Sequence, residues 1–344
     1  MHLRMLIIQC KLLYCPEELM VRAGSHSVLQ SFRFCHLLAA SLTKFSAVDC
    51  GPEVPLQLHG VRHLSALTKL TEVALIDNAA VGNLTELKHL RQLHTLSLIS
   101  CVEGPLRASS LTNIQKLILN MGTAQTVNLS CCTQLTFLSF EDICSRLQTV
   151  TLPQGDSVQL RDLHMTGCAD INPLLVMSNL SCASRLATLE ITSVYPSNLR
   201  QGDWPLCMPE LRVVALRQLD CQLPQQLCKY PNLRDLNLWG LVRSDLPGWF
   251  AELTQITSLL LSCSKFTAFP AAIIQLSQLC TLCIKDIEPP MVIGPDITSI
   301  TKWKRLRVID LTADGYSLDS QLYLLEVYYQ LKSAGVQIVL SAGP

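Results

Sequence analysis

Residues 233–238 read Leu233-Arg-Asp-Leu236-Asn-Leu238, an apolar residue followed by others three and five positions later. This LxxLxL pattern recurs every 21 to 27 residues, with copies that begin at Leu70, Leu93, Ile114, Leu135, Leu160, Leu186, Leu211, Leu233, Ile256, Leu279 and Leu306. Side chains alternate between the two faces of a strand. Each copy therefore predicts one short strand whose anchors face a core and whose intervening residues face solvent.

Eleven copies in one register resemble the leucine-rich-repeat superfamily. The resemblance implies an α/β solenoid, a horseshoe with a parallel β-sheet on the concave face. Mixed short helices, 3-10 turns and strands are expected on the convex face. Three segments that begin with an apolar residue and Pro are similar to turns of intracellular plant- and algal-type members: Leu223-Pro-Gln-Gln-Leu227, Leu246-Pro-Gly-Trp-Phe250 and Phe269-Pro-Ala-Ala-Ile273.

The pattern divides the chain into three parts. We expect degenerate N-terminal repeats over 1–69, truncated at the start, regular repeats over 70–311, and a C-terminal cap over 312–344. In the regular part, the alternation at 126–129 and 147–152 predicts short convex-side strands. In the cap we expect a helix over about 319–333 with Asp319 as N-cap, ended by Gly335, and a final strand over 336–340.

The cap helix carries two apolar stripes. One is formed by Leu322, Leu325 and Tyr329. The other is formed by Leu324, Val327, Tyr328 and Leu331. Both stripes are expected to seal the final coil, because the exposed end of a solenoid needs a cap.

Composition favours a reduced, cytoplasmic protein. The chain has 16 cysteines but 344 residues, far longer than small domains that need disulfides. Cys101 and Cys168 fall where the family places Asn or Cys, and Asn78 fills that position in its own repeat. The cytoskeleton, the axoneme and the nucleus remain alternatives. The 27 basic and 27 acidic residues balance, so we expect no nucleic acid or membrane partner.

Signatures of catalysis and cofactor binding are absent from the sequence. It contains no phosphate-binding glycine loop, nucleophile elbow or HExxH motif. The one CxxC, Cys280 to Cys283, falls on a predicted strand, where a redox pair lacks the helix N-terminus that lowers its pKa. We therefore expect no enzyme activity, no cofactor and no metal.

Two rows of side chains are predicted to line the concave face. The mid-strand row is Ala74, Ser97, Ile118, Ser139, His164, Glu190, Ala215, Asn237, Leu260, Cys283 and Asp310. The row two residues later is Ile76, Ile99, Asn120, Glu141, Thr166, Thr192, Arg217, Trp239, Ser262, Lys285 and Thr312.

Six residues in these strands are candidate partner-binding residues. Trp239 lies beside Arg217, flanked by Asp235 and Asn237, and Trp and Arg dominate binding hot spots. A single exposed aromatic residue is also common on ordinary surfaces. His164 and Glu190 are expected to be neighbours, either a polar hot spot or a cross-strand pair on a solvated sheet.

The resulting hypothesis is a monomeric, non-enzymatic scaffold that binds an unidentified protein on its concave face. One alternative is the substrate-recognition part of an F-box-type ubiquitin ligase, and another is a GTPase-activating repeat protein. The second alternative needs a well-placed Arg or Asn, for which Arg217 and Asn237 are the candidates.

Overall fold

The structure is a computed structural model that describes residues 18–23, 42–49, 67–76, 84–99, 105–120, 126–141, 149–154, 158–167, 180, 183–192, 204–217, 223–241, 245–262, 265–285, 291–312 and 318–339. The chain divides into two units, Met1–Ala183 and Ser184–Pro344. Cys101, Cys168 and Asn78 lie outside the described residues.

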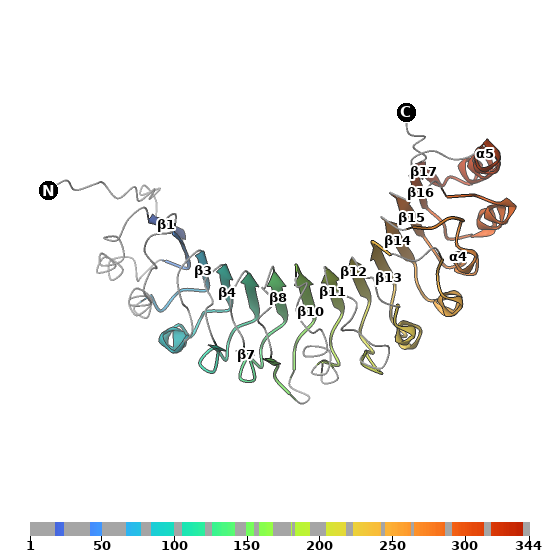
Figure 1. The fold of residues 1–344 in the computed structure, drawn as a ribbon. Coiled ribbons are helices and arrows are strands. Elements are labelled where there is room, and N and C mark those ends of the chain that lie inside the picture. Colours follow the sequence, from blue (N-terminus) through green and yellow to red (C-terminus); the bar gives the residue numbers. More distant parts are fainter. Residues whose placement is uncertain are drawn as a thin grey trace. The chain divides into compact units, whose positions relative to one another are not determined.

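The first unit contains a parallel sheet with one strand per coil (Figure 1). Its strands run in the order β1-β2-β3-β4-β6-β8-β10, and successive strands pair in parallel and without offset. Their bounds are β1 Glu18–Ala23, β2 Lys44–Asp49, β3 Glu72–Ile76, β4 Thr95–Ile99, β6 Lys116–Asn120, β8 Phe137–Glu141 and β10 Asp162–Thr166.

The second unit repeats this arrangement in the order β11-β12-β13-β14-β15-β16-β17, again with all pairs parallel. Its strands are β11 Thr188–Thr192, β12 Val213–Arg217, β13 Asp235–Trp239, β14 Ser258–Ser262, β15 Thr281–Lys285, β16 Val308–Thr312 and β17 Gln337–Val339. Each LxxLxL copy described by the structure ends in such a strand.

Burial follows the predicted alternation. In β13, Leu236 and Leu238 are fully buried, whereas Asp235, Asn237 and Trp239 on the other face are half-buried. Because the anchors stack from coil to coil, they form a continuous Leu-rich core in each unit. Burial of a Leu side chain contributes about 1.5–3 kcal/mol relative to an exposed one, so the anchors supply most of the stabilisation.

Apolar residues at three-residue steps bend the chain into each strand. In the coil before β4, the N–H of Leu87 donates to Leu84, that of Leu90 to Leu87 and that of Leu93 to Leu90, each at 3.0 Å. All four leucines are buried. A bond from residue i+3 to residue i gives three residues per turn, so every third side chain points into the core.

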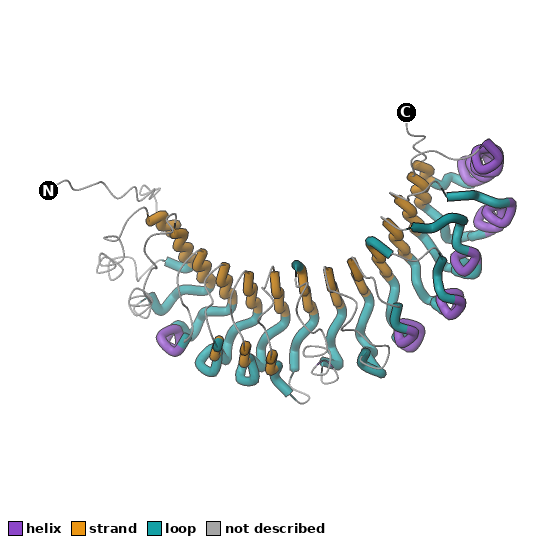
Figure 2. The backbone as a smooth tube through the Cα atoms, viewed as in Figure 1, coloured by secondary structure: helices purple, strands orange, loops and turns teal. Residues whose placement is uncertain are grey.

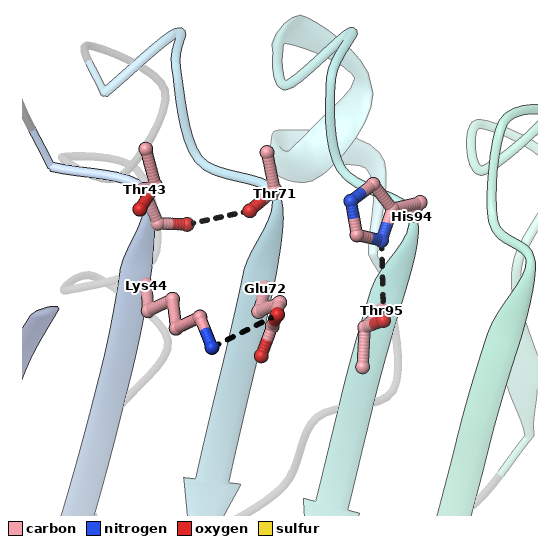
Figure 3. A network of polar contacts seen from close by, with 6 residues as sticks. All are labelled: Thr43, Lys44, Thr71, Glu72, His94 and Thr95. Carbon is pink, nitrogen blue, oxygen red and sulfur yellow. Dashed lines mark hydrogen bonds and ion pairs between the residues drawn. The ribbon is translucent and has the colours of Figure 1, made fainter. Parts of the chain in front are cut away.

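A second backbone pattern joins successive coils. The carbonyl just before a strand accepts bonds from two consecutive N–H groups of the next coil: Thr43 O from Thr71 N (2.8 Å) and Glu72 N (3.2 Å). In the second unit, Arg234 O likewise accepts from Thr257 N and Ser258 N. The hydroxyl of Thr71 adds a third bond to Thr43 O, at 3.1 Å (Figure 3).

The side opposite the sheet differs between the units (Figure 2). The first unit has the 3-10 helix η3 (Thr85–His89) and a small parallel sheet formed by β5 (Leu106–Arg107), β7 (Thr126–Asn128) and β9 (Thr149–Thr151). β7 and β9 confirm the short strands predicted at 126–129 and 147–152.

The second unit has short helices on this side: η6 (Gln225–Lys229), η7 (Gly248–Glu252), α4 (Ala271–Ile274) and η8 (Pro295–Lys302). Pro224, Pro247 and Pro270 are the N-caps of the first three, one residue earlier than the first turn expected from the sequence. Their φ angles lie between −74° and −64°, within the range that the proline ring imposes.

The last coil contains α5 (Leu318–Ser333) and β17. The helix ends where Gly335 adopts a φ of 77°, and the N–H of Gly335 donates to Lys332 O at 3.0 Å. Asp319 lies inside the first turn of α5, so its predicted N-cap position is wrong.

Only one of the two apolar stripes of α5 seals the coil. Leu324, Val327 and Leu331 are buried. The stripe of Leu322, Leu325 and Tyr329 is exposed, contrary to the prediction. A single helix buries one side against its neighbours; α5 packs against η8, and its buried side is the stripe of Leu324, Val327 and Leu331. The boundaries at residues 69 and 311, which separate the N-terminal repeats, the regular repeats and the cap expected from the sequence, stay a prediction.

Tyr230 ties two coils of the second unit together. Its ring is fully buried, and its hydroxyl donates to the carbonyl of Pro205 at 2.8 Å. Tyr230→Phe leaves that buried carbonyl without its donor, so we expect a loss of about 1–2 kcal/mol in the free energy of unfolding. Urea unfolding measures this loss. Tyr329→Phe, at an exposed ring, is the control, and equal stability of both variants would contradict the role of the bond.

Adjacent cysteines in the first unit provide a second test. Cys131 is exposed, whereas Cys132 is buried and its pKa is raised to about 12, chiefly by that burial. The thiolate is the reactive form. In native protein at pH 8, we expect iodoacetamide to label Cys131 and to spare Cys132 until urea is added. Tandem mass spectrometry resolves the two sites, and equal native labelling would refute the buried placement.

Candidate partner-binding face

The strand face of the second unit carries the predicted rows in register. Glu190 pairs with Ala215, then Asn237, Leu260, Cys283 and Asp310 in succession. The row two residues later runs Thr192, Arg217, Trp239, Ser262, Lys285 and Thr312. Neighbouring strands are about 4.8 Å apart, so the position of each side chain along the face follows from its strand number.

Arg217 and Trp239 form the centre of the candidate site. They are register partners on β12 and β13, and the guanidinium carbon lies 4.4 Å from the centroid of the indole ring. Nη2 of Arg217 is also 3.4 Å from Oε1 of Glu190 on β11. A cation over an exposed aromatic ring contributes about 0.5–1 kcal/mol. Together the contacts hold a long, otherwise mobile side chain in one orientation.

Asp235 and Asn237 share the face with Trp239 but are separated from it along β13. Asn237 is two residues away, and Asp235 is four residues away, which is about 13 Å along a strand. Burial raises the pKa of the Asp235 carboxyl above its ordinary value of 3.8. The structure therefore brings Glu190, Arg217 and Trp239 together and leaves Asp235 at the other end of the strand.

A second ion pair, which the sequence did not single out, lies farther along the same face. Nζ of Lys285 on β15 is 2.8 Å from Oδ2 of Asp310 on β16. Oδ1 of Asp310 also accepts a 2.6 Å hydrogen bond from the hydroxyl of Thr312. Sequence reasoning missed this pair because its members are diagonal neighbours: the two charges lie on adjacent strands, two residues apart in register.

In both ion pairs the cation is the more exposed member. The side chain of Arg217 is 44% exposed and that of Glu190 is 20% exposed. The values for Lys285 and Asp310 are 40% and 10%. Each pair therefore presents its positive end to solvent and covers its carboxylate.

The first unit has a different set of contacts on its strand face. The ring of His164 lies 5.0 Å from that of Phe137, and Nζ of Lys116 lies 4.8 Å above the same Phe137 ring. Lys44 and Glu72 form an exposed pair at 3.2 Å on β2 and β3 (Figure 3). Such a surface pair contributes about 0–1 kcal/mol.

The expected contact of His164 with Glu190 involves residues of different units. His164 belongs to the first unit, where it stacks against Phe137. Glu190 belongs to the second unit, where its carboxylate meets Arg217. The pair stays a prediction, and so do both of its interpretations.

Several small side chains that were expected to face solvent are buried: Ser139, Thr192, Ala215, Ser262 and Asp310. Larger neighbours and hydrogen bonds explain two of them. Ser139 donates to the carboxylate of Glu141, and Asp310 lies beneath Lys285. Position on the face therefore does not by itself make a short side chain accessible.

The Cys280 and Cys283 pair lies at a strand, as predicted: Cys280 precedes β15 and Cys283 is within it. The pKa of Cys283 is raised, first by burial and then by Asp310, while Lys285 opposes the shift. A raised pKa disfavours the nucleophilic thiolate. Within the described ranges, no group of three or more His, Cys, Asp or Glu side chains is arranged to hold a metal ion.

None of the helices in the described part of the chain is long and apolar enough to span a membrane.

Asp235→Asn tests whether the carboxyl of Asp235, at the start of β13, has a raised pKa in the folded protein. A carboxyl whose pKa is higher in the folded state adds stability below its unfolded pKa, and that contribution is lost as the pH rises through the folded pKa. We therefore expect Asp235→Asn to be more stable than the wild type at pH 7. The difference should shrink as the pH falls toward 3.8. Urea midpoints across this range measure it, and a constant difference would exclude the carboxyl as its cause.

Comparison with known proteins gives weak likenesses. No protein-family model matches the chain, and no curated protein matches it. An internalin from Listeria monocytogenes has a TM-score of 0.48 and 15% identity, covering 94% of this chain and 82% of its own. A leucine-rich-repeat protein of Leptospira interrogans has a TM-score of 0.44 and 16% identity, covering 93% and 89%. The plant peptide hormone receptor RGFR1, in complex with RGF2, has a TM-score of 0.44 and 17% identity, covering 83% and 49%.

The fold assignment rests on the geometry of the chain itself. Each described LxxLxL copy forms one strand with a buried face, and within each unit the strands are parallel and in register. The chain therefore folds as a leucine-rich-repeat solenoid.

Proposed function

We propose that the protein is a non-enzymatic interaction module that binds a protein partner on the strand face of residues 184–344. The observation that carries this proposal is the stack of Arg217 on Trp239, held from the other side by Glu190. The surrounding rows offer an open, mixed polar and apolar surface. A surface of this kind suits contact with another protein better than a reaction that needs a dry pocket.

The residue types support a contact site. Trp and Arg are enriched among the residues that dominate binding energy. Trp239 is half-buried: the guanidinium of Arg217 lies over its ring, and the rest of the indole stays accessible to solvent. An indole ring left partly in water gains apolar burial when a partner arrives.

Preorganisation also supports the site. Ordering a rotamer-rich side chain at an interface costs about 0.5–1.5 kcal/mol. Contacts with both Glu190 and Trp239 already restrict Arg217 in the free protein. Part of this cost is therefore met before binding, which favours use of the guanidinium as a fixed donor.

The finer features of the hypothesis belong to this proposal. We propose an intracellular protein of plant or algal type that acts in the cytoplasm as a monomer. The Pro-capped turns of η6, η7 and α4 support the type. The length of the chain, far above that of small disulfide-stapled domains, supports a reducing compartment.

The contacts of Arg217 bear differently on the two alternative functions. A GTPase-activating protein needs an arginine that reaches a transferred phosphoryl group, and the contacts of Arg217 with Glu190 and Trp239 do not favour that role. A recognition subunit of an F-box-type ubiquitin ligase would use the same face to hold its substrate. The experiment below therefore tests the shared binding step.

The test is a pull-down from native extract with quantitative mass spectrometry, comparing the wild type with the double variant Arg217→Ala, Trp239→Ala. A hot spot contributes about 2 kcal/mol or more, equivalent to about 30-fold in affinity. We expect the wild-type partner to be recovered at a yield at least tenfold lower by the double variant. Equal recovery of the same partners would remove this patch from the site.

The matched control is Trp249→Ala with Arg305→Ala. These residues have the same types and lie in the same unit, in η7 and in an exposed turn, away from the two rows of the face. The control should retain the partner. Circular dichroism and urea midpoints of both double variants confirm that the comparison involves folded proteins.

A further inference from the structure

The strand face of the second unit has a symmetric order of charges. With one residue taken from each strand, β11 to β16 present acid, cation, aromatic, apolar, cation, acid: Glu190, Leu260 and Asp310 from the mid-strand row, and Arg217, Trp239 and Lys285 from the row two residues later. Each carboxylate lies on the outer side of its cation, as seen from the centre. The space between the two cations is therefore bounded by positive charge at both ends and has Trp239 and Leu260 in the middle.

The two cations are partly exposed to solvent although each has a carboxylate beside it. A guanidinium has five N–H donors and an ammonium has three. Nη2 of Arg217 lies 3.4 Å from Oε1 of Glu190. The cations are also the exposed members of both pairs, so a partner approaching the face meets their positive ends first.

The spacing of the cations matches an extended peptide. Arg217 and Lys285 occupy the same row on β12 and β15, three strands apart, which is about 14 Å. Four residues of extended chain also span about 14 Å, and side chains i, i+2 and i+4 point to the same side. A segment lying across the strands would thus direct every second side chain at the face.

Resting on the function proposed above, we propose that the partner presents an extended segment of the form acid-x-apolar-x-acid. The two acidic side chains meet Arg217 and Lys285 from the inner side. The apolar side chain between them lies over Trp239 and Leu260, both of which are half-buried. Asn237 on β13, the register partner of Leu260, supplies an amide that bonds to the main chain of the segment.

Fluorescence anisotropy with rhodamine-labelled synthetic peptides tests this inference. The probe is Ser-Glu-Ser-Leu-Ser-Glu-Ser, and its controls replace both Glu residues by Gln or move them to adjacent positions. Each exposed ion pair contributes modestly and the probe forms two of them, so we expect the probe to bind about tenfold more tightly than the Gln peptide. Affinity should fall as salt is added.

Protein variants test the roles of the two cations. Arg217→Gln and Lys285→Gln should each weaken binding of the probe, whereas Arg212→Gln should not. Arg212 is a matched exposed cation in an ion pair with Glu210 and lies outside the row. The double variant Arg217→Glu, Lys285→Glu should reverse the preference and bind a further peptide, Ser-Lys-Ser-Leu-Ser-Lys-Ser, better than the probe. Circular dichroism and the urea midpoint of the double variant confirm that the reversed preference comes from folded protein.

Three outcomes would overturn the inference: no binding of the probe at millimolar concentration, equal binding of the probe and the Gln peptide, or tighter binding of a single-stranded DNA oligonucleotide. These outcomes are separable from failure of the proposed function. If the probe fails while Arg217→Ala, Trp239→Ala still abolishes partner recovery, the face binds a protein of different chemistry. If both tests fail, the face is not the binding site.

Discussion

The rest of the structure depends on the hydrogen bonds accepted by the carbonyl group of the residue just before a strand. It accepts N–H bonds from two consecutive residues of the next coil, as Thr43 does from Thr71 and Glu72. The same pair of hydrogen bonds recurs at the carbonyl groups of Thr71, His94, Gln115, Thr136, Ala187, Arg212, Arg234, Thr257 and Cys280. Since two donors meet one acceptor, a strand displaced by one residue would lose the pair. Each coil therefore fixes the register of the next.

Register determines both the core and the candidate site. A shift of one residue would move every anchor to the open face, so the Leu-rich core and the outward rows depend on the same bonds. Arg217 meets Trp239 because β12 and β13 are aligned without offset. Lys285 reaches Asp310 because β15 and β16 are aligned in the same way. The contacts of the face are thus consequences of backbone geometry as much as of side-chain chemistry.

Much of the fold was predictable because the spacing of the apolar anchors indicates the strands directly. The spacing of Leu233, Leu236 and Leu238 predicts a strand, and the structure has one at Asp235–Trp239. The candidate site was predictable only in part. Which row a residue occupies follows from counting, but the direction in which a long side chain leans does not. Asp310 shows the difference, because the hydroxyl of Thr312 and the ammonium of Lys285 draw an apparently exposed acid into a buried position.

The cap helix was mispredicted for a related reason. Helical periodicity identified two apolar stripes on α5, and only tertiary packing decides which of them is covered. Ser320 helps to make that choice, because its buried hydroxyl accepts the N–H of Ile293 at 2.9 Å and turns that side of the helix inward. The stripe with Leu325 consequently faces solvent.

The unbroken alignment of the strands in the second unit makes its open face a grid. One axis advances by a strand at a time and the other by two residues along a strand, about 4.8 Å and 6.8 Å per step. Replacing one side chain alters the chemistry at a single grid point and leaves every other point in place. Insertions in the turns between strands leave the positions of the side chains on the grid unchanged as well. A surface of this kind can acquire a new binding preference one position at a time, without rebuilding the core beneath it.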